Sequence, residues 1–311
     1  MTPNHRRPTV ESLEARVLFS TAALPRPDHV VVLLEEDHSY NELFGTPQFP
    51  LEIWPVLAPG PVAQAPYLAG LAQSGAVFTN AHSIGTHNII DYNAIFSGFL
   101  PKGTDKPPFT APNIASELNA AGLSFGGYSE GLPHTGYTGG GVGLYTRAHN
   151  PWVDFANVPA SENLPFTKFR SYAALPTVSY VVPNEDDNMH SGQIYEADNW
   201  YHNNIAPYAA WAMKHNSLLI VTWDESHQGD DQIPVIFFGP MVKPGKYTQH
   251  ITQSNILRTL EDMYGLAPTG RSAQTPPITN IFKTSATSAR KQPRHPTPPA
   301  KAHIKREAPR G

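Results

Sequence analysis

The chain has 311 residues, 40% of them hydrophobic, which is enough to bury the core of one large domain. Its 22 Lys and Arg balance 26 Asp and Glu too evenly to suggest nucleic acid or an anionic membrane as the main partner. No apolar run approaches the roughly 18 to 20 residues that cross a bilayer, so no membrane span is expected. Because the chain has no cysteine, disulfides, thiolate nucleophiles and cysteine-bound zinc are excluded, and any bound metal must use oxygen or imidazole ligands.

The two ends of the chain differ from its middle. Residues 1–26 have a basic start followed by VESLEARVLFS, which is too charged for a standard signal peptide. This stretch is similar to a short motif at the start of many exported bacterial proteins, so we expect an export-type leader and a secreted or cell-surface protein. Residues 284–311 are basic and rich in proline, and their composition predicts a disordered tail. One domain is therefore expected over residues 27–283.

Within this domain, short β-branched runs alternate with helical patterns. This alternation is typical of an α/β fold, with a mostly parallel sheet covered on both faces by helices. The patterns predict strands at 29–34, 76–79, 217–223 and 233–238, and helices at 67–73, 114–121 and 253–264. The glycine-rich stretch 136–143 lacks the flanking strand and helix that a nucleotide-binding loop requires, so we interpret it as a surface loop near a site.

Acidic residues directly follow two of the predicted strands. Residues 35–38 read EEDH, and residues 224–227 read DESH. Ligands gather at the carboxyl ends of the strands in such sheets, so carboxylates from the two clusters could converge on one hard divalent cation. Taken alone, each cluster could equally consist of solvated turn residues or helix caps.

Residues 29–40, HVVVLLEEDHSY, resemble the opening strand and metal loop of a phosphoesterase family, the bacterial and fungal acid phosphatases and phospholipases C. The usual form of that loop is Glu-Asn-His-Ser. The resemblance continues in order over roughly residues 28–283, through the segments FTN (78–80), YNAIFSG (92–98), AAGLSFGGYSE (120–130), RAHNPWV (147–153), LPTVSYVVPN (175–184), MH (189–190), LLIVTWDE (218–225), GPMVKPG (239–245) and LRTLEDMYGL (257–266). It implies a fold like that of alkaline phosphatase, with a mostly parallel sheet between helical layers and a metal site at the strand ends.

The resemblance also implies metal ligands. Glu36 and Asp37 stand where the family has its Glu and Asn ligands, and Asp224 and Glu225 stand at its second acidic pair. Aspartate at position 37 keeps an oxygen donor and adds a charge. This half of the site looks competent to hold one divalent cation, and hard oxygen ligands admit several such metals.

The nucleophile position departs from the family pattern. Relatives begin the helix before the YNAIFSG-like segment with Ser-x-Pro-Asn, and the Ser is the expected nucleophile. Ungapped alignment places Asn88 there, with Asp91 at the family Asn, and an amide is not a nucleophile of this kind. Thr86 could take over if the loop is shifted by two residues, and a metal-activated water is the alternative.

The second metal-binding half has also changed. Relatives read Asn-Asp-Met-His-Asp where residues 187–191 read DNMHS, which leaves Asn188 and His190 as candidate ligands. A family His is replaced by Gln253, and His227 and His250 are the nearest candidates to compensate. A lost carboxylate and a lost imidazole both weaken a cation site, so the pattern argues against a second metal.

Arg147 and His149 remain in the RAHNPWV segment. A guanidinium fork suits phosphate, and an imidazole could protonate a leaving alcohol. The alternative interpretations are a surface Arg and a structural His.

Two functional hypotheses follow. The first is a secreted hydrolase of small phosphorylated substrates, most simply phosphate monoesters, with one divalent cation at the acidic half-site. The second is a catalytically impaired relative that binds an anion or a metal outside the cell, because residues 88, 188, 191 and 253 are all altered.

Overall fold

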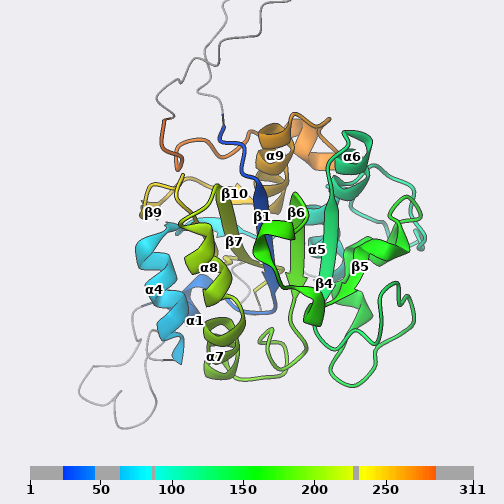
Figure 1. Cartoon of the computed structure of the whole chain (residues 1–311), viewed down its shortest axis with the longest axis horizontal. Helices are drawn as coiled ribbons and strands as arrows, with labels where there is room; N and C mark the ends of the chain where they lie inside the picture. The colour runs from blue at the N-terminus through cyan, green and yellow to red at the C-terminus, as the bar shows by residue number, and fades with distance from the viewer. Residues whose placement is uncertain (1–23, 46–63, 86–87, 227–230, 285–311) are drawn as a thin grey trace, which may run out of the picture.

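The computed structural model describes residues 24–45, 64–85, 88–226 and 231–284 of the chain (Figure 1). The predicted leader and tail lie almost wholly outside these ranges. In the described parts, no helix combines the length and the apolar character needed to cross a bilayer.

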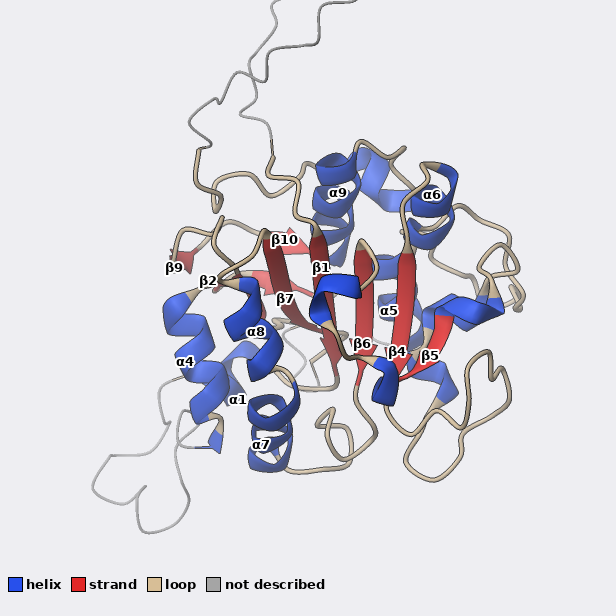
Figure 2. Ribbon diagram, in the orientation of Figure 1, coloured by secondary structure: helices blue, strands red, loops and turns tan. Residues whose placement is uncertain are grey.

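An eight-stranded sheet forms the centre of the molecule, in the order β5-β4-β6-β1-β7-β8-β2-β9 (Figure 2). Neighbouring strands run parallel except for β8, which is antiparallel to both β7 and β2. The strands are β1 (His29–Glu35), β2 (Ala76–Phe78), β4 (Phe125–Ser129), β5 (Asn163–Pro165), β6 (Val178–Val182), β7 (Ser217–Trp223), β8 (Val235–Phe238) and β9 (Gly245–Tyr247). Two further short strands, β3 (Ala81–His82) and β10 (Ile251–Thr252), pair with each other. The predicted mostly parallel sheet is confirmed.

β1 lies between β6 and β7, and its side chains form the middle of the core. Its residues Val30 to Leu33 are completely buried, as expected for a strand covered on both faces. Because β1 and β7 are parallel and in register, with Glu35 opposite Trp223, the residues that follow them emerge together at the carboxyl edge of the sheet.

Helices cover both faces of the sheet (Figures 1 and 2). The helix α7 (Ile194–Asn204) contacts both α4 (Pro66–Ser74) and α8 (Ala206–Ala212). The hydroxyl of Tyr208 in α8 donates to Leu218 O of β7. On the other face, α5 (Asn88–Phe96) packs against α9 (Gln253–Tyr264), and Tyr180 of β6 donates to Ile95 O. The shorter helices α1 (Tyr40–Phe44) and α6 (Ile114–Ala120) complete the α-helices of the described residues. This two-layer cover confirms the expected α/β architecture.

Candidate active site and metal centre

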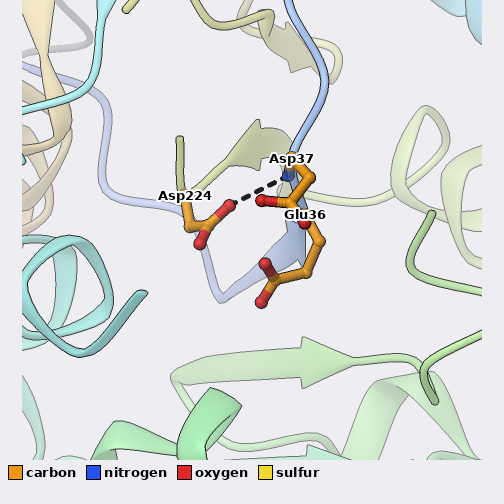
Figure 3. A group of neighbouring side chains, drawn as sticks. All are labelled: Glu36, Asp37 and Asp224. Carbon is orange, nitrogen blue, oxygen red and sulfur yellow. Dashed lines mark hydrogen bonds between the residues drawn. The ribbon is translucent and has the colours of Figure 1, made fainter. Parts of the chain in front are cut away.

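Three carboxylates meet at the carboxyl edge of the sheet, where β1 and β7 end side by side. Glu36, Asp37 and Asp224 each place one oxygen within 4.8 Å of the others (Figure 3). The main chain holds the arrangement, because Asp224 N donates to Glu35 O at 2.9 Å and Asp37 N donates to Asp224 Oδ1 at 3.2 Å. The two acidic clusters of the sequence therefore meet at this edge of the sheet, with two carboxylates from the first cluster and one from the second.

The chemistry of this cluster fits a hard cation. All three side chains are buried, and Asp224 Oδ2 has no hydrogen-bond partner within the described structure. Burial raises the pKa of Asp224 to about 8. Burial, and next the charge of Asp224, raise the pKa of Glu36 well above its usual range. Because like charges repel strongly in a dry site, a divalent cation among these oxygens would stabilise their ionised forms.

The loop after β6 is hydrogen-bonded to the loop that carries Glu36 and Asp37. Asn188 O accepts a hydrogen bond from Glu36 N at 3.0 Å, which ties this loop to the end of β1. Both loops contain a residue with left-handed backbone, Asp37 with φ 62° and Met189 with φ 77°. Such conformations are costly for residues other than glycine and concentrate at functional sites.

Tyr92 of α5 contacts the metal centre from the other side. Its hydroxyl donates to Glu36 Oε1 at 2.6 Å, and burial raises the pKa of this hydroxyl well above its usual value, so Tyr92 stays a donor. The Tyr92 ring stacks on the His149 imidazole, with ring centroids 5.4 Å apart. α5 therefore helps to position both Glu36 and His149.

Two imidazoles border the carboxylates. His149 Nε2 lies 3.0 Å from Glu36 Oε1, and His190 Nε2 lies 3.7 Å from Asp37 Oδ2. Burial, and next the charge of His190, lower the pKa of His149 to about 3. The His149 ring is therefore neutral at neutral pH, which does not support its predicted role of protonating a leaving alcohol.

Glu185 faces both imidazoles from the side away from the carboxylates. Its Oε1 lies 3.2 Å from His149 Nδ1, and its Oε2 lies 2.8 Å from His190 Nδ1. The sequence analysis missed Glu185, because it falls between the matched segments that end at Asn184 and resume at Met189. It also missed Tyr92, although this residue opens the matched YNAIFSG segment.

Asn188 and Glu225 lie close to the centre without joining the group of three carboxylates. The Asn188 side chain accepts from His190 N at 2.9 Å through Oδ1, and its Nδ2 lies 3.4 Å from His149 Nδ1. Asn188 thus contacts the imidazole of His149 and the main chain of His190. Glu225 is buried directly after Asp224, and its main-chain N donates to Asp224 Oδ1 at 2.6 Å.

Gln253 occupies the position of the family His at the start of α9. Its Nε2 donates to Asp224 O at 2.6 Å, while its Oε1 is buried without a partner among the described residues. The amide supports the loop that carries Asp224. The structure pairs His250, a proposed substitute, with His82, with ring centroids 5.0 Å apart.

The guanidinium of Arg147 contacts groups other than the three carboxylates. Its Nη2 lies 2.6 Å from Asp154 Oδ1 and donates to Val153 O, and its Nε donates to Thr138 O. These contacts occupy the guanidinium with Asp154 and main-chain oxygens, and the phosphate-binding role of Arg147 stays a prediction.

The nucleophile position is only partly described. Asn88 is the first residue of α5, and its side chain lies outside the described part of the structure. Thr86 and His227 lie outside the described residues altogether. The roles assigned to these three residues stay predictions.

Comparison with known proteins identifies the family. The model of the phosphoesterase family matches residues 60–267, which is more than half of the chain. The chain belongs to the phosphoesterase family. This membership confirms the resemblance drawn from the sequence and makes the chain a hydrolase of phosphate esters.

Two proteins similar in sequence to this chain are named as phosphatases. The chain is 39% identical over 275 residues to a phosphatidylinositol-3-phosphatase of Mycobacterium tuberculosis, covering 86% of this chain and 87% of that one. It is 28% identical over 239 residues to a phosphate-repressible acid phosphatase of Penicillium chrysogenum, covering 68% of this chain and 57% of that one.

Solved structures support the fold. A protein of the alkaline phosphatase superfamily from Vibrio parahaemolyticus matches with a TM-score of 0.53 at 14% identity, covering 85% of this chain and 76% of that one. A phosphonate monoester hydrolase from Silicibacter pomeroyi matches with a TM-score of 0.54 at 12% identity, covering 85% and 78%. The predicted alkaline-phosphatase-like fold is confirmed.

Proposed function

We propose that this phosphoesterase is a metal-dependent phosphomonoesterase whose cation site is formed by Glu36, Asp37 and Asp224. The observation that carries the proposal is the convergence of these three buried carboxylates, one of which keeps an unpartnered oxygen. Carboxylates packed this closely in a buried site repel one another unless protons or a cation compensate their charge. An oxygen-only set of this kind suits a hard divalent ion.

A bound cation would supply charge stabilisation for the phosphoryl oxygens of the substrate. Residues of the chain position the carboxylates. Tyr92 fixes Glu36 by its hydrogen bond, and Gln253 supports the loop of Asp224. In hydrolysis, an oxygen nucleophile loses its proton and forms a new bond to phosphorus, the ester P–O bond breaks, and the leaving oxygen gains a proton. If the nucleophile is a side-chain hydroxyl, a water molecule then attacks the phosphorylated residue and releases phosphate. Because Asn88 cannot serve as nucleophile, we propose the hydroxyl of Thr86 or a water molecule for that role.

The names of the relatives suggest the substrate class. A phosphatidylinositol-3-phosphatase and an acid phosphatase both act on a phosphate joined to one organic group. We therefore propose a phosphate monoester as substrate, with a phosphorylated inositol lipid as one candidate. Export from the cell stays a prediction that rests on residues 1–26.

Phosphate release from a chromogenic monoester tests the proposal. Asp224→Asn removes one charge from the cluster while keeping the shape of the side chain, so we expect kcat/KM to fall by a factor on the order of 100 or more. Asp262→Asn is the matched control, because Asp262 contacts Arg258 on the outer side of α9 and should leave the rate unchanged.

The same assay addresses the hypothesis of an impaired binding protein. Turnover by the wild-type chain that Asp224→Asn abolishes supports the phosphomonoesterase. Equal rates in the wild type and Asp224→Asn would overturn the proposed cation site. No release by a folded wild-type chain that still binds divalent cations would instead favour the binding protein.

A further inference from the structure

One carboxylate spans two imidazoles beside the metal centre. The two oxygens of Glu185 are divided between His149 and His190, each oxygen lying close to the Nδ1 atom of one ring, at 3.2 and 2.8 Å. The opposite nitrogen of each ring, Nε2, lies near Glu36 or Asp37. Both rings are therefore held between Glu185 on one side and the cluster of carboxylates on the other.

The main chain around Glu185 is anchored independently of its side chain. Its backbone N donates to Leu144 O at 3.0 Å, and its backbone O accepts from Ser191 N at 2.8 Å. The side chain is mostly buried, with 15% of its surface exposed. Glu185 is thus a fixed acceptor rather than a swinging surface carboxylate, and a change of its side chain leaves the anchors of the loop in place.

The arrangement selects one tautomer of the His190 imidazole, because its Nδ1 lies 2.8 Å from Glu185 whereas its Nε2 lies 3.7 Å from Asp37. A neutral imidazole carries a proton on only one nitrogen, and a carboxylate near Nδ1 favours the form with the proton there. In His190 the lone pair then lies on Nε2, which faces the Asp37 carboxylate. In His149 the nearer carboxylate lies at Nε2, 3.0 Å away in Glu36 against 3.2 Å from Nδ1 to Glu185, so these contacts do not select a tautomer of that ring. Histidines near protein metal sites are commonly oriented in this way by a carboxylate on the far nitrogen, and loss of that carboxylate weakens metal binding.

We propose that Glu185 is a positioning residue that holds His190 with its Nε2 lone pair directed toward the metal centre. This proposal rests on the proposed function for the identity of the centre, but its physical content is the orientation of the His190 ring. We therefore expect Zn²⁺, which favours imidazole ligands, to gain affinity from the oriented ring, whereas Mg²⁺ binds chiefly to oxygen.

Calorimetric titration of the full-length, metal-free protein with Zn²⁺ and with Mg²⁺ tests the proposal. In Glu185→Ala we expect Zn²⁺ affinity to fall by about 10- to 100-fold. Mg²⁺ affinity should stay within about threefold of the wild type, because its ligands are oxygens. Glu185→Gln retains one oxygen acceptor for one ring, so its loss of Zn²⁺ affinity should be intermediate.

Asp186→Asn is the matched control. It removes one negative charge from the adjacent residue, whose side chain contacts neither imidazole in the described structure, and both affinities should stay within about threefold. If Zn²⁺ affinity is unchanged in Glu185→Ala, or if Zn²⁺ and Mg²⁺ affinities fall equally, the positioning role is overturned.

Nitrogen-15 NMR of the histidine rings provides a readout that needs neither metal nor turnover. The wild type should show the Nδ1-protonated tautomer for His190, and Glu185→Ala should lose it. An unchanged tautomer pattern in Glu185→Ala would contradict the proposal. If these results appear as expected but the wild type hydrolyses no phosphate monoester, the proposed function fails while the positioning role stands.

Discussion

Glu35 and Glu36 are consecutive residues at the end of β1, yet their carboxylates lie on opposite faces of the sheet. Glu36 accepts a hydrogen bond from Tyr92 of α5, whereas Glu35 lies beside Tyr201 of α7. This separation follows from the alternation of side chains along a strand. Only Glu36 joins the cluster with Asp37 and Asp224, although Glu35 and Glu36 are both completely buried.

The Glu35 and Glu36 pair gives the first prediction. Burial raises the pKa of Glu35 well above its usual range, and neither of its oxygens has a hydrogen-bond partner of normal geometry among the described residues. We expect Glu35→Gln to keep phosphatase activity within about threefold and to melt no lower than the wild type at pH 8, because it replaces a poorly satisfied acid by a neutral group.

Glu36→Gln should behave differently. It removes a charge from the cluster itself, so we expect kcat/KM to fall by a factor on the order of 100. Steady-state kinetics and thermal melts of Glu35→Gln and Glu36→Gln, each compared with the wild type, check the two expectations. Equal losses of activity in both variants would contradict the assignment of the two carboxylates to separate faces.

The second prediction concerns the hydrogen bond from Tyr92. Tyr92→Phe keeps the ring that stacks on His149 and removes only the donor to Glu36 Oε1. We expect a loss of about 1–3 kcal/mol in the free energy of unfolding, and a decrease in kcat/KM of about tenfold because Glu36 is less well fixed.

Tyr180→Phe is the matched control for Tyr92→Phe. It removes an equally buried hydroxyl, which donates to Ile95 O rather than to a site residue. Its stability should fall by a similar amount while its kinetics stay unchanged. If Tyr180→Phe reduced activity as strongly as Tyr92→Phe, the loss would be a general effect of stability.

The third prediction is the pH dependence of stability without metal. The pKa of Asp224 is raised to about 8 in the folded protein, so between its ordinary value and pH 8 the folded state binds a proton that the unfolded chain has lost. This contribution to stability falls as pH rises. The pKa of His149 is lowered to about 3, so its contribution has the opposite sign and is complete by about pH 6.5.

Above pH 6.5 the titration of His149 therefore no longer changes the stability, whereas the titration of Asp224 still lowers it as pH rises. We expect the melting temperature of the metal-free protein to fall between pH 6.5 and pH 8, by about 2–4 °C for each kcal/mol lost. Asp224→Asn should flatten this decrease, and a divalent cation should reverse it in the wild type. Differential scanning calorimetry checks the prediction, and a melting temperature that rises over this range would contradict it.

The fourth prediction concerns the residue at the family His position. Gln253→His should raise Zn²⁺ affinity by about tenfold, because imidazole is a better zinc ligand than a primary amide. The change removes the hydrogen bond to Asp224 O, so stability should fall by about 1–3 kcal/mol. Gln274→His, at an exposed position, is the control and should leave Zn²⁺ affinity unchanged. Equal Zn²⁺ affinity in the wild type and Gln253→His would place residue 253 outside metal binding.

Much of the fold could be predicted from the sequence. The bounds of β7 and α9 agree with the prediction, because an uninterrupted apolar run marks the first and Gly265, with φ 70°, ends the second. The helices α7 and α8 were not predicted. The segment of α7 is rich in Asn, His and Asp, which are weak helix formers, and it is stabilised by packing of Trp200 and Tyr201.

The site was predicted where it depends on strand ends and missed where it depends on packing between loops. Asp224 follows a recognisable strand, so its approach to Glu36 could be expected from the order of a parallel sheet. Glu185 reaches its two imidazoles only because the loop after β6 folds back against residue 144, and no local pattern marks that contact.

Hydrolysis of a chromogenic phosphate monoester by the full-length protein tests the metal centre most directly, when it is measured before and after treatment with a chelator and after divalent cations are restored. We expect turnover that the chelator abolishes and a divalent cation recovers, and a rate lower by a factor on the order of 100 or more in Asp224→Asn. Turnover that is unaffected by complete removal of metal would contradict the assignment of Glu36, Asp37 and Asp224 as a catalytic metal centre.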